Sequence, residues 1–349
     1  MTEPTATNFD VKALLARLAG GVTLDEDEAR EAIDRMTDGA ASLPQMAAFL
    51  MALRVRGETV AEITGAARLL RDRMIRVSAA ADSIDIVGTG GDGHETYNIS
   101  TCAALIVAGT GVPVAKHGNR SVSSRSGASD VLVALGVRID LDPSDVPRII
   151  EDAGIAFLWA PMHHPAMKAW APVRAELGLR TLFNLLGPIC NPASVKRQVV
   201  GVYDRRWVVP IADTLRALGS ERCWVVHGHD GLDELSTTGP TTVASLIDGK
   251  ITSFEVTPEE AGLKRVSLAD LKGGDATTNA AALRAVLDGA RNAYRDIAVI
   301  NAAAALVVAD KATDIGEGAR MAEAAIDGGH ARNALDRLIA VTNATRAKP

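Results

Sequence analysis

The chain has 349 residues, a length that predicts about two domains. Hydrophobic residues make up 47% and charged residues 23% of the sequence, which is ordinary for a globular protein with a substantial core. The formal net charge of −6 argues against a basic surface for nucleic acid that covers the whole chain.

The cysteines and the apolar stretches of the sequence indicate where in the cell the protein is located. The three cysteines, Cys102, Cys190 and Cys223, are odd in number and too far apart for a disulfide framework or a zinc site, which is typical of a reducing cytoplasm. The polar, acidic N-terminal segment does not have the pattern of a signal peptide. Residues 297–309 form the longest apolar stretch, but it contains Asn301 and is shorter than the ~20 residues of a membrane span. We therefore expect a cytoplasmic protein in which this stretch is a buried helix.

Residues 1–76 are predicted to contain helices only, because no strand-like alternation occurs there. Each helix start has a recognisable capping signal. In chain order these signals are Thr23 with Glu26, Ser42 followed by Pro44, and Thr59 with Glu62 before residues 60–73, and Gly39 and Gly57 end the first two helices.

From residue 83 onward, short runs rich in strand-forming residues alternate with helical ones, which favours a parallel α/β sheet. Predicted strands cover 83–87, 112–115, 155–159, 198–203 and 223–227, and predicted helices cover 99–108, 129–135, 144–153 and 207–218. Residues 164–186 have no clear strand, and the tail after Asn279 is helical.

The predicted fold class is therefore α/β, with a small N-terminal helical domain and a larger α/β domain whose mainly parallel central sheet is flanked by helices. We assign residues 1–76 to the helical domain and expect 164–190 to pack against it. Residues 77–163 and 191–349 form the predicted α/β substrate-binding domain.

The segment VGTGGD, residues 87–92, is the first candidate functional motif. Gly88, Gly90 and Gly93 match a dinucleotide fingerprint, but the acid expected ~20 residues later is missing because 96–129 contain no Asp or Glu. A Walker A loop is excluded because no Gly-Lys-Ser/Thr follows. A tight turn without a ligand remains an alternative, although four glycines in residues 88–93 exceed what one turn needs.

An anion-binding loop is the favoured interpretation of this segment. Glycines let backbone N–H groups approach an anion closely, and a helix that starts near Asn98 would turn its positive end toward the loop. Ser100 and Thr101 add hydroxyl donors at the same place. Asp92 would repel a phosphate, so we expect it to accept hydrogen bonds from substrate hydroxyls.

Two further motifs complete the predicted site. The segment KHGNRSVSS, residues 116–124, with Arg125 after it, follows a predicted strand and mixes cations with hydroxyl and amide donors, which favours a second phosphate loop over a solvated face. Asp233 and Glu234 are adjacent carboxylates in a glycine-rich turn, and Mg²⁺ typically lies between such carboxylates and substrate phosphates. Taken alone, this pair would more often be two exposed charges.

In this order, the motifs resemble the anthranilate phosphoribosyltransferase family. The resemblance covers nearly the whole chain and is strongest in VGTGGDGHETYNIST (87–101), KHGNRSVSSRSGASDVLVALG (116–136), HPAMKAWAPVRAELGLRTLFNLLGPICNP (164–192) and GLDELS (231–236). It implies the third step of tryptophan synthesis from chorismate, in which the amino nitrogen of anthranilate attacks C1 of phosphoribosyl diphosphate (PRPP) and pyrophosphate leaves. It also implies a Mg²⁺-dependent homodimer.

The resemblance implies roles for individual residues of this sequence. Those that match PRPP-binding positions are Gly88, Gly91, Asp92, Thr96, Asn98, Ile99, Ser100, Thr101, Lys116, His117, Gly118, Asn119, Arg120, Ser121, Val122, Ser123, Ser124 and Ala128. Those that match anthranilate contacts are Gly88, Asn119 and Arg174, and His117, His164 and Pro188 match the lining of the anthranilate channel. Ser100, Asp233 and Glu234 match magnesium positions.

One position departs from the family. Where the family usually has Ser-Gly-Ser-Ala-Asp, residues 126–130 are Ser-Gly-Ala-Ser-Asp, so Ala128 lacks a hydroxyl. The hydroxyl of Ser129 replaces it only if the backbone shifts. One ligand hydrogen bond is therefore in doubt.

The chemistry that the resemblance implies agrees with these residue types. Lys116 and backbone amides supply preorganised positive charge for the leaving pyrophosphate, and the Arg174 guanidinium suits a carboxylate because it can bind both oxygens. Without its sequence context, Arg174 would be taken for a surface charge and His164 for a structural histidine. An aromatic amine needs no strong general base, and the sequence does not identify the final proton acceptor.

Two rival functions are alternatives, the first a related enzyme and the second a protein of another class. A related pyrimidine nucleoside phosphorylase would share the fold but would not need the sequence context of Arg174. A nucleic-acid-binding relative without catalysis should have a basic face and a degraded glycine loop, and this chain has an intact loop and a negative net charge. We therefore expect small-molecule substrates rather than nucleic acid or a membrane.

Overall fold

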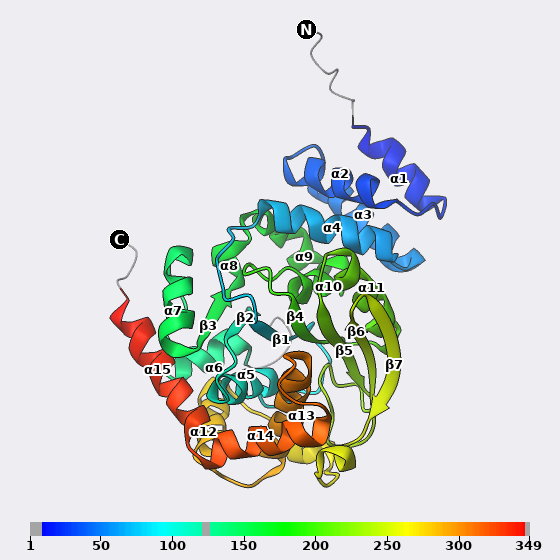
Figure 1. Ribbon diagram of the computed structural model, residues 1–349. Coiled ribbons are helices and arrows are strands. Elements are labelled where there is room, and N and C mark those ends of the chain that lie inside the picture. Colours follow the sequence, from blue (N-terminus) through cyan, green and yellow to red (C-terminus); the bar gives the residue numbers. More distant parts are fainter. Residues whose placement is uncertain (1–8, 121–125, 346–349) are drawn as a thin grey trace. The chain divides into compact units, whose positions relative to one another are not determined.

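The computed structural model describes residues 9–120 and 126–345 (Figure 1). The chain divides into two compact units, one comprising Met1–Met74 and His164–Leu186 and the other Ile75–His163 and Gly187–Pro349. Residues 75–76 and 187–190, which the sequence analysis placed with the helical domain, group with the second unit.

The first unit is helical. Its helices are α1 (Val11–Ala19), α2 (Glu26–Thr37), α3 (Leu43–Arg56), α4 (Val60–Arg73) and α9 (Ala171–Leu177), with the 3₁₀ turn η2 (Pro165–Lys168) and the first part of α10 (Leu182–Ile189). The predicted signals at Ser42 and at Thr59 with Glu62 are confirmed. The predicted capping box at Thr23 and Glu26 is wrong, because Asp25 and Glu28 cap α2 instead.

Trp170 is the centre of the core of this helical unit and has no exposed surface. Its ring packs against Phe49 of α3 and Phe183 of α10, and its indole N–H donates to the Thr37 hydroxyl at 2.9 Å. The segment after His164 therefore packs against the N-terminal helices, because it supplies the large aromatic side chains that the short helices bury.

The second unit contains a seven-stranded sheet in the order β3-β2-β1-β4-β5-β6-β7. Its strands are β1 (Ile84–Gly88), β2 (Val114–Gly118), β3 (Ile155–Trp159), β4 (Arg197–Gly201), β5 (Arg222–Gly228), β6 (Thr241–Ile247) and β7 (Lys250–Val256). The first five strands are parallel, and β6 and β7 are antiparallel. This confirms the predicted α/β fold class.

The β6–β7 hairpin was not predicted from the sequence. Its turn is Asp248–Gly249, with φ of 50° and 75°, as expected for a two-residue hairpin turn with positive φ at both central positions. An Asp-Gly pair between such runs is a strong local signal for a hairpin.

Helices α5 (Ile99–Gly109) and α13 (Ala293–Val308) contact the central strands, and α11 (Val208–Ala217) contacts β5, β6 and β7. The other helices of this unit are α6 (Ala128–Ala134), α7 (Val146–Ala153), α8 (Ala160–His163), α12 (Ala276–Leu287), α14 (Ile315–Asp327) and α15 (His330–Ala344). None of the helices in the described residues is long and apolar enough to cross a lipid bilayer.

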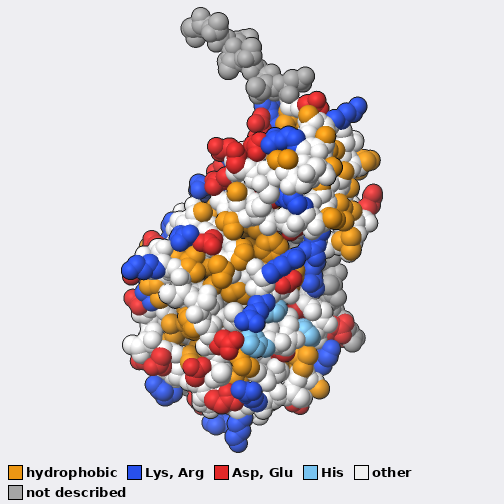
Figure 2. All heavy atoms as spheres, turned by 90° about the vertical axis from the view of Figure 1, so that its right-hand side faces the viewer, with side chains coloured by type: hydrophobic (Ala, Val, Ile, Leu, Met, Phe, Trp, Pro, Cys, Tyr) orange, Lys and Arg blue, Asp and Glu red, His pale blue; other side chains and the backbone are white. Residues whose placement is uncertain are grey.

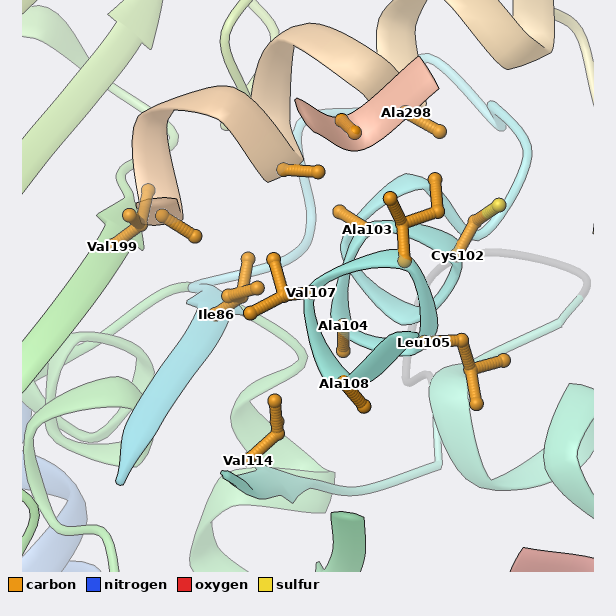
Figure 3. Packing of buried hydrophobic residues seen from close by; sticks show 14 of the residues in the cluster. Ile86, Cys102, Ala103, Ala104, Leu105, Val107, Ala108, Val114, Val199 and Ala298 are labelled. Atoms are coloured by element: carbon orange, nitrogen blue, oxygen red, sulfur yellow. The ribbon is translucent and has the colours of Figure 1, made fainter. Parts of the chain in front are cut away.

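The core between sheet and helices is made of small aliphatic side chains. Ile86 of β1 packs beside Val107 of α5, and Ala298 of α13 lies near Ala103 of α5 (Figure 3). Alternate strand residues point to opposite faces, so Asp85 lies on the other face from Ile84 and Ile86. Small side chains let α5 and α13 pack against each other, and α5 also contacts β1 and β2.

Candidate active site

The glycine-rich loop leaves the carboxyl end of β1 and leads into α5. A Cβ on Gly88 would lie too close to Asp233 Oδ2, so a larger residue there requires the Asp233 carboxylate to move. Gly90 and Gly91 have φ of 68° and 74°, a region that favours glycine. The Gly90 N–H donates to Asp233 Oδ2 at 2.6 Å. The glycines therefore make room for an acidic side chain as well as exposing backbone amides.

The start of α5 is held by polar contacts from distant segments. The N–H of Ser100, in its first turn, donates to Glu234 Oε1 at 3.2 Å. Asn98 precedes the helix, and its side chain accepts from Asn279 Nδ2 at 3.0 Å and donates to Ser126 O at 3.1 Å. The amide of Asn98 is thus largely engaged within the protein, and the Ser100 region carries the positive end of the helix.

The acidic pair follows β5, with Asp233 buried against the glycine loop and Glu234 half-buried beside the start of α5. Burial, together with the neighbouring Asp92 charge, raises the pKa of Asp233 to about 7. Burial also raises the pKa of Glu234 well above its ordinary value, with a contribution from the Asp233 charge that Lys116 opposes. Three carboxylates thus repel one another in a poorly solvated place, which a cation would relieve.

These donors fit Mg²⁺, which prefers oxygen ligands and usually binds one or two protein carboxylates together with water and substrate phosphates. Among the described residues, no cluster of three or more His, Cys, Asp or Glu side chains is arranged to hold a metal. The pair Asp233 and Glu234 offers two of the carboxylate oxygens that such an ion binds.

Lys116 lies inside the protein rather than in a loop. Strand β2 runs to Gly118, so Lys116, His117 and Gly118 belong to the strand, and the expected end of this strand at residue 115 is wrong. Lys116 Nζ donates to Ile86 O at 2.5 Å and to Ser100 Oγ at 3.3 Å. Burial lowers the pKa of Lys116, and the charges of Asp85 and Glu234 oppose that change. The ammonium group therefore lies beside the start of α5.

Asp85 and Asn191 were missed by the sequence analysis. Asp85 is fully buried, accepts from His117 N at 3.2 Å, and accepts from Asn191 Nδ2 at 2.7 Å. Asn191 Nδ2 also donates to Ala115 O at 2.8 Å. These contacts fix β2 where it presents Lys116. Asp85 is a charged residue in an otherwise apolar strand just before the glycine motif, and this position could have identified it as a candidate site residue.

The remaining predicted residues of the α/β unit occupy varied settings. His117 Nδ1 lies 3.0 Å from Gly187 O, and the carbonyl oxygen of Pro188 accepts from Gln198. Asn119 Oδ1 accepts from the N–H of Arg120, whose exposed guanidinium lies 5.7 Å from the centre of the Trp159 ring. Ser121, Val122, Ser123 and Ser124 lie outside the described residues.

Ala128 is the position at which the sequence departs from the family pattern. Ala128 is the first residue of α6, and Ser129 follows it with no exposed surface. The Ser129 hydroxyl has no hydrogen-bond partner among the described residues. Ser129 is therefore buried inside the first turn of the helix in this backbone conformation.

Arg174 and His164 belong to the helical unit. The Arg174 guanidinium lies 5.6 Å from the centre of the Phe183 ring, and burial lowers its pKa. Burial is the only cause of this shift among the described residues. A cation so placed is suited to an anionic ligand. His164 is also buried, at 8% exposure.

The fold and the site define a class of protein. Residues 12–74 match the helical bundle domain of a glycosyl transferase family, and residues 80–332 match the a/b domain of that family. These two matches cover the helical segment and the sheet with its loops, so the chain is a glycosyl transferase of this class.

Comparison with individual proteins identifies the particular family within this class of glycosyl transferases. The chain is 59% identical over 335 residues to anthranilate phosphoribosyltransferase of Rhodopseudomonas palustris strain BisB18, with 96% of this chain and 99% of that protein covered. The Methylocella silvestris enzyme is 60% identical over 333 residues, with 95% of each covered. The chain belongs to the anthranilate phosphoribosyltransferase family.

Solved structures agree with this assignment. The Thermus thermophilus anthranilate phosphoribosyltransferase has a TM-score of 0.89 and 42% identity, with 96% of this chain and 100% of that chain covered. The Saccharomyces cerevisiae enzyme in complex with PRPP and Mg has a TM-score of 0.87 and 29% identity, with 97% and 99% covered. The same yeast enzyme was also solved with 4-fluoroanthranilate.

Proposed function

We propose that this chain transfers the 5-phosphoribosyl group of PRPP to the amino group of anthranilate in tryptophan biosynthesis, with release of pyrophosphate. The observation that carries this proposal is that the acidic pair joins the glycine loop to the start of α5, because Gly90 N donates to Asp233 and Ser100 N donates to Glu234. Membership of the anthranilate phosphoribosyltransferase family supplies the substrate pair.

The proposed PRPP site is formed by the loop at residues 88–101 and the segment at 116–124, with Ala128. Its amides and the positive end of α5 bind phosphate oxygens, and Lys116 adds a positive charge beside Ser100. Asp92 accepts from ribose hydroxyls. These residues hold the sugar so that C1 faces the incoming amine, and positioning of two substrates can supply about 7–11 kcal/mol of the barrier.

The proposed magnesium ligands are Ser100, Asp233 and Glu234. When bound, Mg²⁺ neutralises the diphosphate and acts as a Lewis acid and template for the leaving group. The protein prepares for this by holding Asp233 on Gly90 N and Glu234 on Ser100 N, so both carboxylates are fixed before substrate arrives. The Mg-bound yeast relative supports the choice of metal.

The proposed anthranilate contacts are Gly88, Asn119 and Arg174, with His117, His164 and Pro188 lining its path. Arg174 binds the carboxylate, because its half-buried guanidinium has no acidic partner among the described residues and offers two parallel donors. No side chain is assigned as a strong base, since the amine attacks in its neutral form.

We further propose a cytoplasmic homodimer whose subunits each have a helical domain and an α/β domain. Free, buried cysteines support a reducing compartment. Exposed apolar side chains on the helical unit, among them Leu43 and Val55, support an interface there, because such groups are usually covered. Acidic and basic side chains are interspersed on the face of the α/β unit that Figure 2 shows, which does not favour nucleic acid.

The proposal is tested by the loss of anthranilate fluorescence with purified enzyme, PRPP and Mg²⁺. We expect loss that requires all three components and releases one pyrophosphate per anthranilate. No loss with folded enzyme would refute the proposal. Phosphate-dependent cleavage of a pyrimidine nucleoside by the same preparation would favour the phosphorylase alternative.

A further inference from the structure

Helix α13 carries a polar side chain that the proposed chemistry does not use. Asn301 has no exposed surface and lies among alanine and aliphatic residues. A buried amide costs free energy unless its polar atoms are hydrogen-bonded. Asn301 Oδ1 accepts from Leu235 N at 3.0 Å, and its Nδ2 donates to Leu235 O at 2.8 Å and Ile297 O at 2.9 Å. Both polar groups of one peptide residue are therefore held by one side chain.

Leu235 immediately follows Asp233 and Glu234 and is itself fully buried. Two hydrogen bonds to the same residue fix both the position and the rotation of its backbone. The carboxylates of the pair accept from Gly90 N and Ser100 N. The pair is thus held by its side chains at the substrate loops and by its following backbone at α13.

Tyr294 lies on the same helix seven residues before Asn301, which is about two turns and therefore the same face. Its hydroxyl donates to Asn98 O at 3.0 Å, and its ring stacks on Tyr97 with 4.4 Å between ring centres. Asn98 directly precedes α5, whose Ser100 contacts Glu234. One rigid helix consequently binds the backbone on both sides of the Ser100–Glu234 contact.

We propose that Asn301 is a positioning residue for the acidic pair, and that α13 sets the spacing between this pair and the start of α5 through Asn301 and Tyr294. The inference deepens the proposed function and rests on it, because it assigns significance to the pair only if Asp233 and Glu234 serve Mg²⁺ and PRPP. Asn301 touches no reacting atom and acts through the backbone of Leu235.

The test compares Asn301→Leu, which keeps a similar size and removes both contacts to Leu235, with Asn301→Asp, which keeps an acceptor for Leu235 N. Thr214→Val is the control, because Thr214 is equally buried but bonds only Pro210 O of its own helix. Calorimetric titration with PRPP in excess Mg²⁺ gives a binding constant without turnover, and steady-state kinetics give KM for each substrate.

For Asn301→Leu we expect the Kd of PRPP and the Mg²⁺ concentration for half-maximal velocity to rise at least tenfold, because displacements of about 1 Å can cost on the order of 100-fold. KM for anthranilate should change less than threefold, and Asn301→Asp should show a smaller defect. A folded Asn301→Leu enzyme with PRPP and Mg²⁺ constants within twofold of the Thr214→Val control would overturn the proposal.

If Asn301→Leu does not fold, Asn301→Asp and amide exchange decide the matter. The Leu235 N–H of the unsubstituted enzyme should exchange slowly. In Asn301→Asp this N–H should exchange faster, and PRPP should bind more weakly. Rapid exchange in the unsubstituted enzyme, or unchanged PRPP binding by Asn301→Asp, would contradict the inference. Failure of the proposed function can be told apart from failure of this inference, because in the former case the unsubstituted enzyme itself would consume no anthranilate.

Discussion

The carboxylate of Asp233 occupies the space that a side chain on Gly88 would need. Gly88 ends β1, and Asp233 follows β5, so the close approach joins two loops that are far apart in the chain. The adjacent Gly90 N–H then donates to Asp233 Oδ2, 143 residues away in sequence. A substitution at residue 88 should consequently act on the proposed metal site as well as on the loop.

Gly88→Ala is expected to lower kcat/KM for PRPP by about 100-fold, because Asp233 must move by roughly 1 Å to admit a methyl group. Gly239→Ala is the control, since no atom lies within 4 Å of a Cβ added there. Steady-state kinetics with varied PRPP and circular dichroism check the result. A folded Gly88→Ala enzyme with normal PRPP kinetics would show that the displacement of Asp233 does not matter.

Arg174→Ala is expected to raise KM for anthranilate by about 10- to 100-fold, which corresponds to loss of a charge-assisted hydrogen bond worth about 1.5–3 kcal/mol. KM for PRPP should stay nearly constant. Arg174→Lys keeps the charge without the planar pair of donors, so its effect should lie in between. Equal effects of Arg174→Ala on both substrates would remove Arg174 from the anthranilate site.

The stabilisation by Mg²⁺ and PRPP should depend on pH through Asp233. Its folded-state pKa of about 7 lies above the ordinary 3.8, so the protonated carboxyl stabilises the ligand-free fold. That stabilisation is complete below the ordinary pKa and is lost as the pH rises through about 7.

Because a metal ligand must be ionised, we expect the rise in Tm on adding Mg²⁺ and PRPP to grow as the pH increases from about 5.5 to about 8. Thermal denaturation at matched ionic strength measures this. Asp233→Asn should show a smaller and flatter response. If the substituted and unsubstituted enzymes had the same pH dependence, another group would be responsible.

The helical unit provides a prediction about stability. Glu62 has no exposed surface, accepts from Leu24 N and Thr59 N, each at 2.9 Å, and pairs with Arg56. Glu62→Ala should reduce the free energy of unfolding by about 3–5 kcal/mol, because it leaves a partly buried Arg56 unpaired.

Chemical denaturation measures the change at Glu62. The control is Glu31→Ala, because the ion pair of Glu31 with Arg35 is solvent-exposed and should contribute less than about 1 kcal/mol. Similar losses for the two variants would mean that burial of the Glu62 carboxylate has no special importance.

The local patterns of the sequence determined the helices, the parallel strands and the family. Some features depend only on neighbours in the chain and can therefore be predicted without a structure. They include the helix caps at Ser42 and Thr59, the strand at residues 155–159 and the glycine loop. The capping box at Thr23 was wrong because Asp25 offered a competing signal two residues later. The β6–β7 hairpin had a local signal that was overlooked.

Only the tertiary structure decided how the site is supported. The burial of Lys116 against Ile86 and Ser100 depends on contacts between separate strands and helices, as does the clamp of Asn301 on Leu235, 66 residues away. The residues next to Lys116 and Asn301 in the sequence do not specify these partners, because the partners come from distant segments of the chain. The sequence alone predicted which residues belong to the chemistry, and packing of α13 and α5 on the sheet decided which other residues contact them.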